Sequence, residues 1–310
     1  MNADTKVLAT PLPKTRARAL DYLDLMKPEL TGLSVLTALC GFYLGSGGTF
    51  QTLLFLHTAL GTLLVGGGAG ALNQFIERRF DALMRRTEHR PLPSGRLFPA
   101  EAALFGAILS AAGIAELAIF VNLLTGFLAF LTWSSYLFLY TPLKRMTAFS
   151  TIIGGIPGAL PPVMGWTAVR QGLTAEAWVL FAILFCWQMP HFFSLAWMYR
   201  RDYARAGFKI LSVHDNDGTR TGRRILLFSL LLLPVSAAPA FINLTGPSSL
   251  YFALLLGGPF LFYAVRLLHQ AGLRLPESQL LVNRYARRMF YTSLVYLPIL
   301  MLVLSIDKLR

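Results

Sequence analysis

Charged residues and cysteines are both scarce in this chain of 310 residues. Only 14% of the residues are charged, against roughly 25% in ordinary soluble domains, which argues against a water-soluble globular protein. The two cysteines, Cys40 and Cys186, lie in different apolar stretches and form no CxxC motif. We interpret both as small apolar packing residues that report nothing about the redox compartment. No cleavable signal peptide is visible either.

Long apolar runs, in contrast, recur from end to end, and 55% of the chain is hydrophobic. Runs near the ~20 residues that span a bilayer indicate an integral membrane protein. We predict an all-α, polytopic bundle of about nine transmembrane helices, at 29–46, 51–74, 99–120, 123–140, 149–168, 175–197, 224–243, 248–268 and 289–306. Residues 1–28 are polar and basic and are predicted to be a mobile cytoplasmic tail, which leaves 29–310 as one transmembrane domain.

The net charge of +13 invites a nucleic-acid partner, but the distribution of the charge argues against one. All but three of the 28 lysines and arginines fall in the N-terminal segment and in the loops that follow even-numbered spans. The opposite side keeps only Arg170, Lys308 and Arg310. This positive-inside pattern predicts a cytoplasmic N-terminus and, for nine spans, an external C-terminus. The excess positive charge is then explained by the orientation of the spans in the membrane and by contact with membrane lipid.

One segment, NQFIERRFDALMRRTEHRPLPSG (73–95), places acids and arginines where a long apolar helix leaves the membrane. If that helix continues, Asn73, Glu77 and Asp81 share one face, because each step of four residues turns a helix by about 400°. Acids one turn apart repel unless a cation lies between them. Arg86 and Arg90, with Arg85, would then hold the phosphates that the cation bridges. A solvated helix end anchored to lipid headgroups explains the arginines but not the shared acidic face.

Further candidate residues lie in later segments. His191 follows a helix-kinking proline in WQMPHFFSLAW (187–197) and is either a packing residue or a neutral imidazole that binds metal or accepts a proton. Lys144 and Arg145 stand at the predicted cytoplasmic mouth, for phosphate or carboxylate groups or for lipid anchoring. In the second charged loop, Asp202 is the best candidate for a second metal contact, with Arg205 beside it.

Taken together, these motifs resemble the protohaem IX farnesyltransferase (haem O synthase) family of UbiA-type intramembrane prenyltransferases. The resemblance rests on N-x3-E-x3-D-A-L-M-x-R-T-x2-R-P-L-P-x-G, then YTPLKR, GG-x2-GA-x-PP-x-x-GW and WQ-x-PHF…Y-x2-DY-x-RAG, in order from about Lys27 to the last span. It implies a nine-helix bundle in a bacterial inner membrane, with a cavity open laterally to lipid. It also implies transfer of the farnesyl group of farnesyl diphosphate to a vinyl group of haem B, with water addition, to give haem O.

Residue by residue, the resemblance implies that Asn73, Glu77 and Asp81 organise Mg2+ on the diphosphate. Arg86 and Arg90 would hold that diphosphate, and His191 would serve the haem. A complete second D-x3-D motif is absent, because Met198 and Ala206 occupy the positions four before and four after Asp202. For the haem propionates, Lys144, Arg145 and the Arg200–Arg205 group are candidates.

Two other interpretations compete. A related prenyltransferase with a hydroxybenzoate, quinone or chlorin acceptor would keep the acidic first loop but would not need the PHF histidine. A transporter of anionic substrates would need charged groups on both sides of the membrane, whereas the predicted outer loops are nearly bare. The family resemblance also suggests downstream haem A synthase or terminal oxidase assembly as partners.

Overall fold

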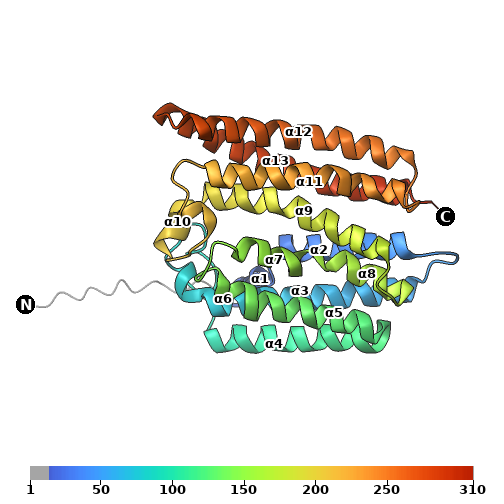
Figure 1. The fold of residues 1–310 in the computed structure, drawn as a ribbon. Helices are drawn as coiled ribbons and strands as arrows, with labels where there is room; N and C mark the ends of the chain where they lie inside the picture. Colours follow the sequence, from blue (N-terminus) through green and yellow to red (C-terminus); the bar gives the residue numbers. More distant parts are fainter. Residues whose placement is uncertain (1–13, 310) are drawn as a thin grey trace, which may run out of the picture.

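The computed structural model describes residues 14–309, which form an all-helical bundle with roughly parallel helix axes (Figure 1). The long helices are α2 (Pro28–Gly45), α3 (Thr52–Asp81), α4 (Pro99–Glu116), α5 (Leu123–Ser134), α7 (Ser150–Ala159), α8 (Pro161–Arg170), α9 (Ala175–Met198), α11 (Thr219–Phe241), α12 (Pro247–Leu273) and α13 (Pro276–Ile306). The remaining elements are α1 (Lys14–Leu25), η1 (Leu117–Val121), η2 (Ser135–Tyr140), α6 (Thr141–Leu143), α10 (Arg200–Arg205) and η3 (Leu211–Val213).

Eight helical segments within the described residues are long and apolar enough to cross a membrane, where α4–η1, α5–η2–α6 and α7–α8 each count as one. Helix α2, of 18 residues, is not one of these eight and packs along α3 and α8 as a ninth helix of the bundle. The predicted polytopic α-bundle is therefore confirmed. One end, where α6, α10 and the 82–98 segment meet, carries the charged loops and is called the charged end below (Figure 1).

Helix lengths differ from the prediction where polar residues extend an apolar run. Helix α3 continues seven residues past the predicted end, through Asp81, as the four-residue spacing of the acidic motif requires. Helix α13 begins at Pro276 rather than 289. Its first turns carry exposed Arg284, Arg287 and Arg288, which interrupt the hydropathy signal without interrupting the helix. A hydropathy run marks the apolar part of a helix, not its ends.

The segment predicted as the span 149–168 is broken between α7 and α8, at Leu160, directly before Pro161 and Pro162. Close packing surrounds this break, because glycines let α2 and α8 backbones approach each other. A Cβ atom built on Gly41 would lie 2.0 Å from the Pro162 carbonyl oxygen, and one on Gly165 would lie 1.7 Å from that of Ala38. No side chain fits at such distances, so the small residues set this helix contact.

The segment before α2 contains a further helix. Residues 1–13 of the predicted tail lie outside the described residues, but Lys14–Leu25 is the helix α1. Leu25 is fully buried, the Tyr22 and Phe105 rings lie 4.9 Å apart, and Asp21 pairs with Arg96 at 2.7 Å. This part of the predicted tail therefore contains a short helix that packs against α3 and α4. The assignment of residues 1–28 to a mobile cytoplasmic tail stays a prediction.

Candidate functional site

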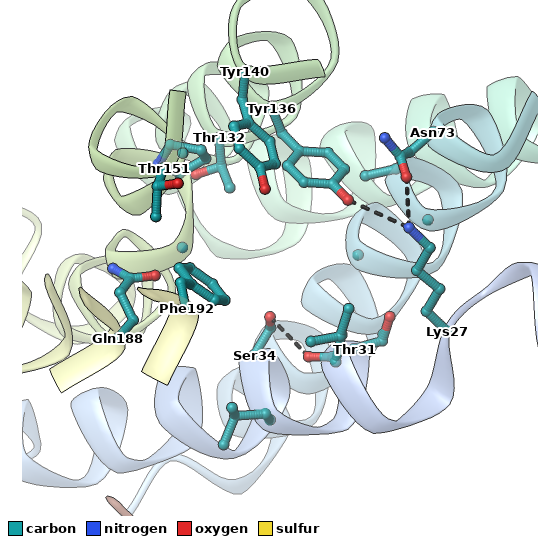
Figure 2. A pocket seen from close by; sticks show the side chains of 18 of the residues that line it. Lys27, Thr31, Ser34, Asn73, Thr132, Tyr136, Tyr140, Thr151, Gln188 and Phe192 are labelled. Carbon is teal, nitrogen blue, oxygen red and sulfur yellow. Dashed lines mark hydrogen bonds between the residues drawn. The ribbon is translucent and has the colours of Figure 1, made fainter. Parts of the chain in front are cut away.

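A central cavity of about 350 Å3 opens between α2, α3, α5, η2, α7 and α9 near the charged end. Figure 2 shows Lys27 and Asn73 on one side of it and Gln188 and Phe192 on the other. Its polar end is lined by Lys27, Asn73, Glu77, Asp81, Arg86, Arg90, Tyr136, Tyr140 and Lys144, and its deeper part by residues that include Leu33, Val65, Thr132, Trp133, Met164, Leu184, Trp187, Gln188, His191 and Phe192. The cavity thus joins a charged mouth to a largely apolar interior.

The acidic motif of α3 forms one buried face of this cavity, as its spacing predicts. Asn73, Glu77 and Asp81 are 0%, 6% and 1% exposed, and all three line the cavity. The helix reaches them without interruption because their spacing of four keeps them on one side of α3. Ionisable groups at this depth are costly unless they are paired, so each needs a partner.

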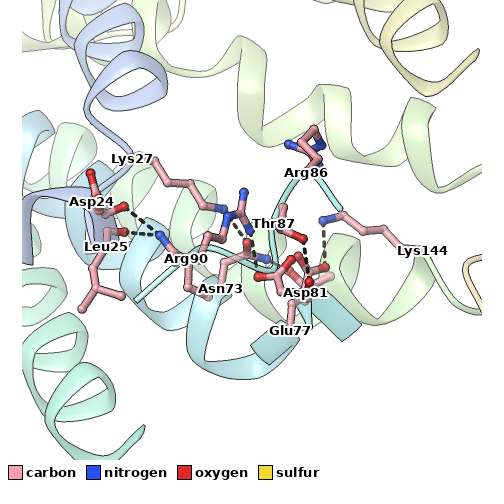
Figure 3. Close-up of polar contacts among 12 residues, drawn as sticks. Asp24, Leu25, Lys27, Asn73, Glu77, Asp81, Arg86, Thr87, Arg90 and Lys144 are labelled. Carbon is pink, nitrogen blue, oxygen red and sulfur yellow. Dashed lines mark hydrogen bonds and ion pairs between the residues drawn. The ribbon is translucent and has the colours of Figure 1, made fainter. Parts of the chain in front are cut away.

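Cations from three other segments meet that face (Figure 3). Lys144 Nζ lies 2.8 Å from Glu77 Oε1, and Arg90 Nη1 lies 2.8 Å from Asp81 Oδ2. Lys27 Nζ donates to Asn73 Oδ1 at 2.6 Å. The second oxygen of Asp81, Oδ1, is buried and has no hydrogen-bond partner among the residues that the structure describes. An unpartnered carboxylate oxygen that lines a cavity is available to a cation, because burying it unpaired is unfavourable.

The pKa values of Lys144 and Lys27 are shifted in opposite directions. Burial alone would lower the pKa of Lys144, but the charge of Glu77 outweighs this effect and raises the pKa of Lys144 above its ordinary value. Burial, and then the nearby charge of Arg90, lower the pKa of Lys27 to about 7. The site therefore contains one lysine that is permanently charged and one that is half charged near neutral pH.

Lys27 is a site residue that the sequence reasoning missed. It was assigned to the tail, yet it caps the start of α2 in a left-handed conformation with φ of 52°. Its ammonium group also lies 3.4 Å from the Tyr136 hydroxyl. A lysine placed directly before Pro28, at the first membrane entry, was the available signal. This signal alone does not predict a role in the site, because the sequence does not show which helix end packs beside Lys27.

At the mouth of the cavity, the second charged loop contacts Arg86 of the first charged loop. The Arg86 guanidinium lies over the rings of Tyr199 and Tyr203, at 5.3 and 6.0 Å. The Arg86 backbone N–H donates to Asp202 Oδ2 at 3.4 Å, and Asp202 also pairs with Arg205. Neither Asp202 nor Arg205 lines the cavity. Asp202 thus fixes the position of the first loop, and its role as a metal ligand stays a prediction.

Most of the residues predicted from the sequence converge in the cavity. Its lining includes Asn73, Glu77, Asp81, Arg86, Arg90, Lys144 and His191, whereas Asp202, Arg205 and Arg145 lie outside it. Arg145 instead lies over the Phe80 ring at 4.3 Å. Among residues 14–309, no three His, Cys, Asp or Glu side chains cluster as a metal site. Any cation at Glu77 and Asp81 therefore needs further oxygens, from Asn73 and from the substrate.

His191 lines the cavity from α9. Its ring stacks on Trp187 at 5.3 Å and on Phe290 of α13 at 4.7 Å, and its Nδ1 lies 2.7 Å from Ser293 Oγ. Trp187 and Phe192 belong to the cavity lining, whereas Trp166 is buried outside it. Aromatic faces and one imidazole edge therefore border the apolar part of the cavity.

Known proteins resemble the chain along nearly its whole length. A family model described as the UbiA prenyltransferase family matches residues 34–303. Protoheme IX farnesyltransferase of Solibacter usitatus is 46% identical over 93% of this chain and 98% of that protein. The protein of the same name from Koribacter versatilis is 40% identical over 99% of both chains.

Solved structures share the fold at lower identity. A structure of digeranylgeranylglyceryl phosphate synthase has a TM-score of 0.75 at 16% identity and covers 94% of this chain and 98% of its own. A UbiA homolog from Archaeoglobus fulgidus bound to DMAPP and Mg2+ has a TM-score of 0.64 at 16% identity, over 89% and 99% of the two chains. These two likenesses concern the fold alone.

Proposed function

Because this chain belongs to the UbiA prenyltransferase family, and within it to the protoheme IX farnesyltransferases, we propose that its cavity joins farnesyl diphosphate to haem B. The farnesyl C1 would bond to the terminal carbon of a haem vinyl group, diphosphate would leave, and water would add to the neighbouring vinyl carbon. The product is haem O. The observation that carries this proposal is the buried acidic face of α3, opposed by cations at the mouth of an apolar cavity.

The donor set at the mouth fits a magnesium ion. Mg2+ is commonly bound by one or two carboxylates together with substrate phosphates. Glu77 and Asp81 supply the carboxylates, Asn73 supplies an amide oxygen, and the unpartnered Oδ1 of Asp81 is the atom that lacks a ligand. When bound, the ion would neutralise charge on the departing diphosphate. A metal ligand role for Asn73, Glu77 and Asp81 is therefore proposed, with no third carboxylate required.

The cations at the mouth would bind the diphosphate directly. Arg90, Lys144 and Lys27 already hold acidic or amide oxygens there, and Arg86 is held over Tyr199 and Tyr203. Diphosphate oxygens would share or replace these partners. Prearranged cations in a site that excludes bulk water stabilise developing negative charge more than water does, which promotes cleavage of the allylic C–O bond.

The deeper part of the cavity would hold the isoprenoid chain and the porphyrin. Leu33, Val65 and Leu184 provide apolar contacts. The ring faces of Trp187 and Phe192 are suited to shield an allylic cation from water. His191 borders the same space and would contact the haem. The haem propionates need cations at the charged end, for which Lys144, Arg145 and the Arg200–Arg205 group stay candidates.

We also propose that the charged end faces the cytoplasm of a bacterial inner membrane. The named relatives are bacterial proteins, and most of the lysines and arginines gather at this end. Family membership removes the transporter interpretation. Contact with haem A synthase or with terminal oxidase assembly stays a prediction.

A product assay tests the proposal. Purified protein is incubated with haem B, farnesyl diphosphate and Mg2+, and the porphyrin product is analysed by mass spectrometry. We expect a species with the mass of farnesyl plus hydroxyl added to haem B. Parallel reactions with a hydroxybenzoate, a quinone or a chlorin as acceptor test the related prenyltransferase activities. Product from one of these acceptors, with haem B unchanged, would refute the assignment.

A further inference from the structure

His191 is held at one edge by a hydroxyl from another helix. Its Nδ1 lies 2.7 Å from Ser293 Oγ on α13. Ser293 is fully buried, and its hydroxyl lies 2.5 Å from the carbonyl oxygen of Phe290, to which it donates. The backbone carbonyl of Ser293 accepts a hydrogen bond from Trp187 Nε1 at 2.8 Å. Hydrogen bonds thus join His191 and Trp187 of α9 to Ser293 of α13, and Ser293 to the backbone of Phe290.

This arrangement selects one tautomer of the imidazole. A serine hydroxyl carries a single proton. If that proton pointed to His191, the Ser293 and Phe290 oxygens would lie 2.5 Å apart with no hydrogen between them, which is repulsive. The proton therefore lies toward Phe290, and Ser293 Oγ accepts from His191 Nδ1–H. It follows that Nε2 carries no proton and keeps a lone pair.

The remaining edge of the ring is the one that borders the cavity. Trp187 and Phe290 stack on the ring at interplanar angles of 24° and 30°, Phe192 packs edge to face with it at 5.5 Å, and Ser293 occupies the Nδ1 edge. Since His191 lines the cavity, the edge that contains Nε2 is the part left to contact a ligand. The stacked rings also prevent the imidazole from turning, so the direction of this lone pair is fixed.

We propose that Ser293 is a positioning residue that holds His191 as the Nδ1–H tautomer, so that Nε2 coordinates the iron of bound haem B. The inference rests on the proposed function, since it names how the acceptor substrate is held. Histidines that bind metals commonly donate their other N–H to a fixed oxygen, which sets the tautomer and the ring orientation. Ser293 and Phe290 supply that arrangement here.

Proton acceptance by Nε2 fits the surroundings less well. It would create a charged imidazolium between two aromatic rings in an apolar wall. No carboxylate contacts His191 among the residues that the structure describes. A buried charge without a partner is strongly unfavourable, whereas an iron ligand stays neutral.

Haem titration of the full-length protein tests the inference. Ferric haem B is added without prenyl diphosphate, and the Soret band and haem affinity are measured for wild type, His191→Ala and Ser293→Ala. We expect His191→Ala to lose the nitrogen-ligand spectrum and to regain it with added imidazole. Ser293→Ala should weaken haem binding by roughly 10- to 100-fold. Ser305→Ala, on the same helix but outside the cavity lining, with a hydroxyl that donates to the Met301 carbonyl, is the matched control and should bind as wild type does.

Ser293→Cys keeps nearly the same shape with a weak hydrogen-bonding group, and it decides the question if the alanine variant does not fold. If both variants fold, a haem affinity of Ser293→Cys between those of wild type and Ser293→Ala supports the inference. If only the cysteine variant folds, a haem affinity well below that of wild type supports it. Equal haem spectra and affinities in wild type, His191→Ala and the Ser293 variants would overturn it.

The product assay on wild type separates the two proposals, because haem O can form without iron ligation by His191. If wild type binds haem with the expected spectrum but forms no haem O, the proposed function fails instead.

Discussion

Replacing Lys27 with methionine should remove a pH dependence from the binding of prenyl diphosphate. Burial, followed by the charge of Arg90, lowers the pKa of Lys27 to about 7. The lowered pKa means that the ammonium is present below about pH 7 and is lost as the pH rises above it. A diphosphate beside Nζ favours the charged form and raises the pKa again. Binding should therefore be tightest below pH 7 and should weaken above it.

The size of the effect follows from the two pKa values. A unit charge at 4 Å with an effective dielectric constant of 20 contributes about 4 kcal/mol, which is about three pKa units. The bound-state pKa of Lys27 should then be near its ordinary value. Between pH 6.5 and 8.5 the charged fraction in the empty site falls from about 0.76 to about 0.03, so affinity should fall roughly 25-fold. At pH 8, binding should take up about 0.9 proton.

Isothermal titration calorimetry measures both quantities. A non-hydrolysable farnesyl diphosphate analogue is titrated at fixed Mg2+, in buffers of different ionisation enthalpy. The ligand and the metal have their own protonation equilibria, so the comparison is wild type against Lys27→Met. Lys209→Met, an exposed lysine of the second loop, is the matched control and should keep the wild-type slope. Identical pH profiles for wild type and Lys27→Met would refute the assignment of Lys27 to the diphosphate.

Three further changes test the site and the packing that supports it. Asp81→Asn should lower magnesium-dependent turnover by a factor on the order of 100, measured by product formation over a range of Mg2+ concentrations. Size-exclusion chromatography should show that the variant stays folded. Turnover equal to that of wild type would contradict the metal role of Asp81. Glu77→Gln should destabilise the apo protein because it leaves the Lys144 ammonium buried and unpaired. The double variant Glu77→Gln, Lys144→Met should recover much of the lost melting temperature. Additive losses in melting temperature would show that the pair is not coupled. Gly41→Ala should destabilise the bundle by about 1–3 kcal/mol or more in a thermal melt, whereas Gly32→Ala on the same helix, with no atom within 4 Å of its Cβ position, should not.

The acidic face of α3 could be predicted from the sequence because helical periodicity is a local property. Residues four apart lie on one side of a helix wherever that helix is placed. The cost of burying unpaired acids then implied that cations would lie nearby. Both inferences needed only the spacing of Asn73, Glu77 and Asp81 and the length of the apolar run before them. The structure confirms that all three line one cavity.

The partners of that face could not be predicted, because they depend on how distant segments pack. Lys27 lies 46 residues before Asn73 in sequence and meets it only because α2 packs along α3. Ser293 of α13 and His191 of α9 lie 102 residues apart in sequence. Serines on apolar helices usually bond to their own backbone, so the sequence pattern of α13 contains no signal for this contact. Hydropathy likewise could not show that α1 is packed.

The balance of charge at the mouth explains why Lys27 should be the residue that titrates. The empty site contains two carboxylates on α3 and three cations held by Coulombic or aromatic contacts, Arg86, Arg90 and Lys144. A neutral Lys27 leaves this group with an excess of one positive charge. A trianionic prenyl diphosphate with one Mg2+ adds one negative charge and cancels that excess. As the C–O bond breaks, negative charge gathers on the leaving diphosphate, and a proton on Lys27 then gains a partner it lacked in the empty cavity. The lysine that burial keeps close to neutral is thus the cation that responds most strongly to the substrate.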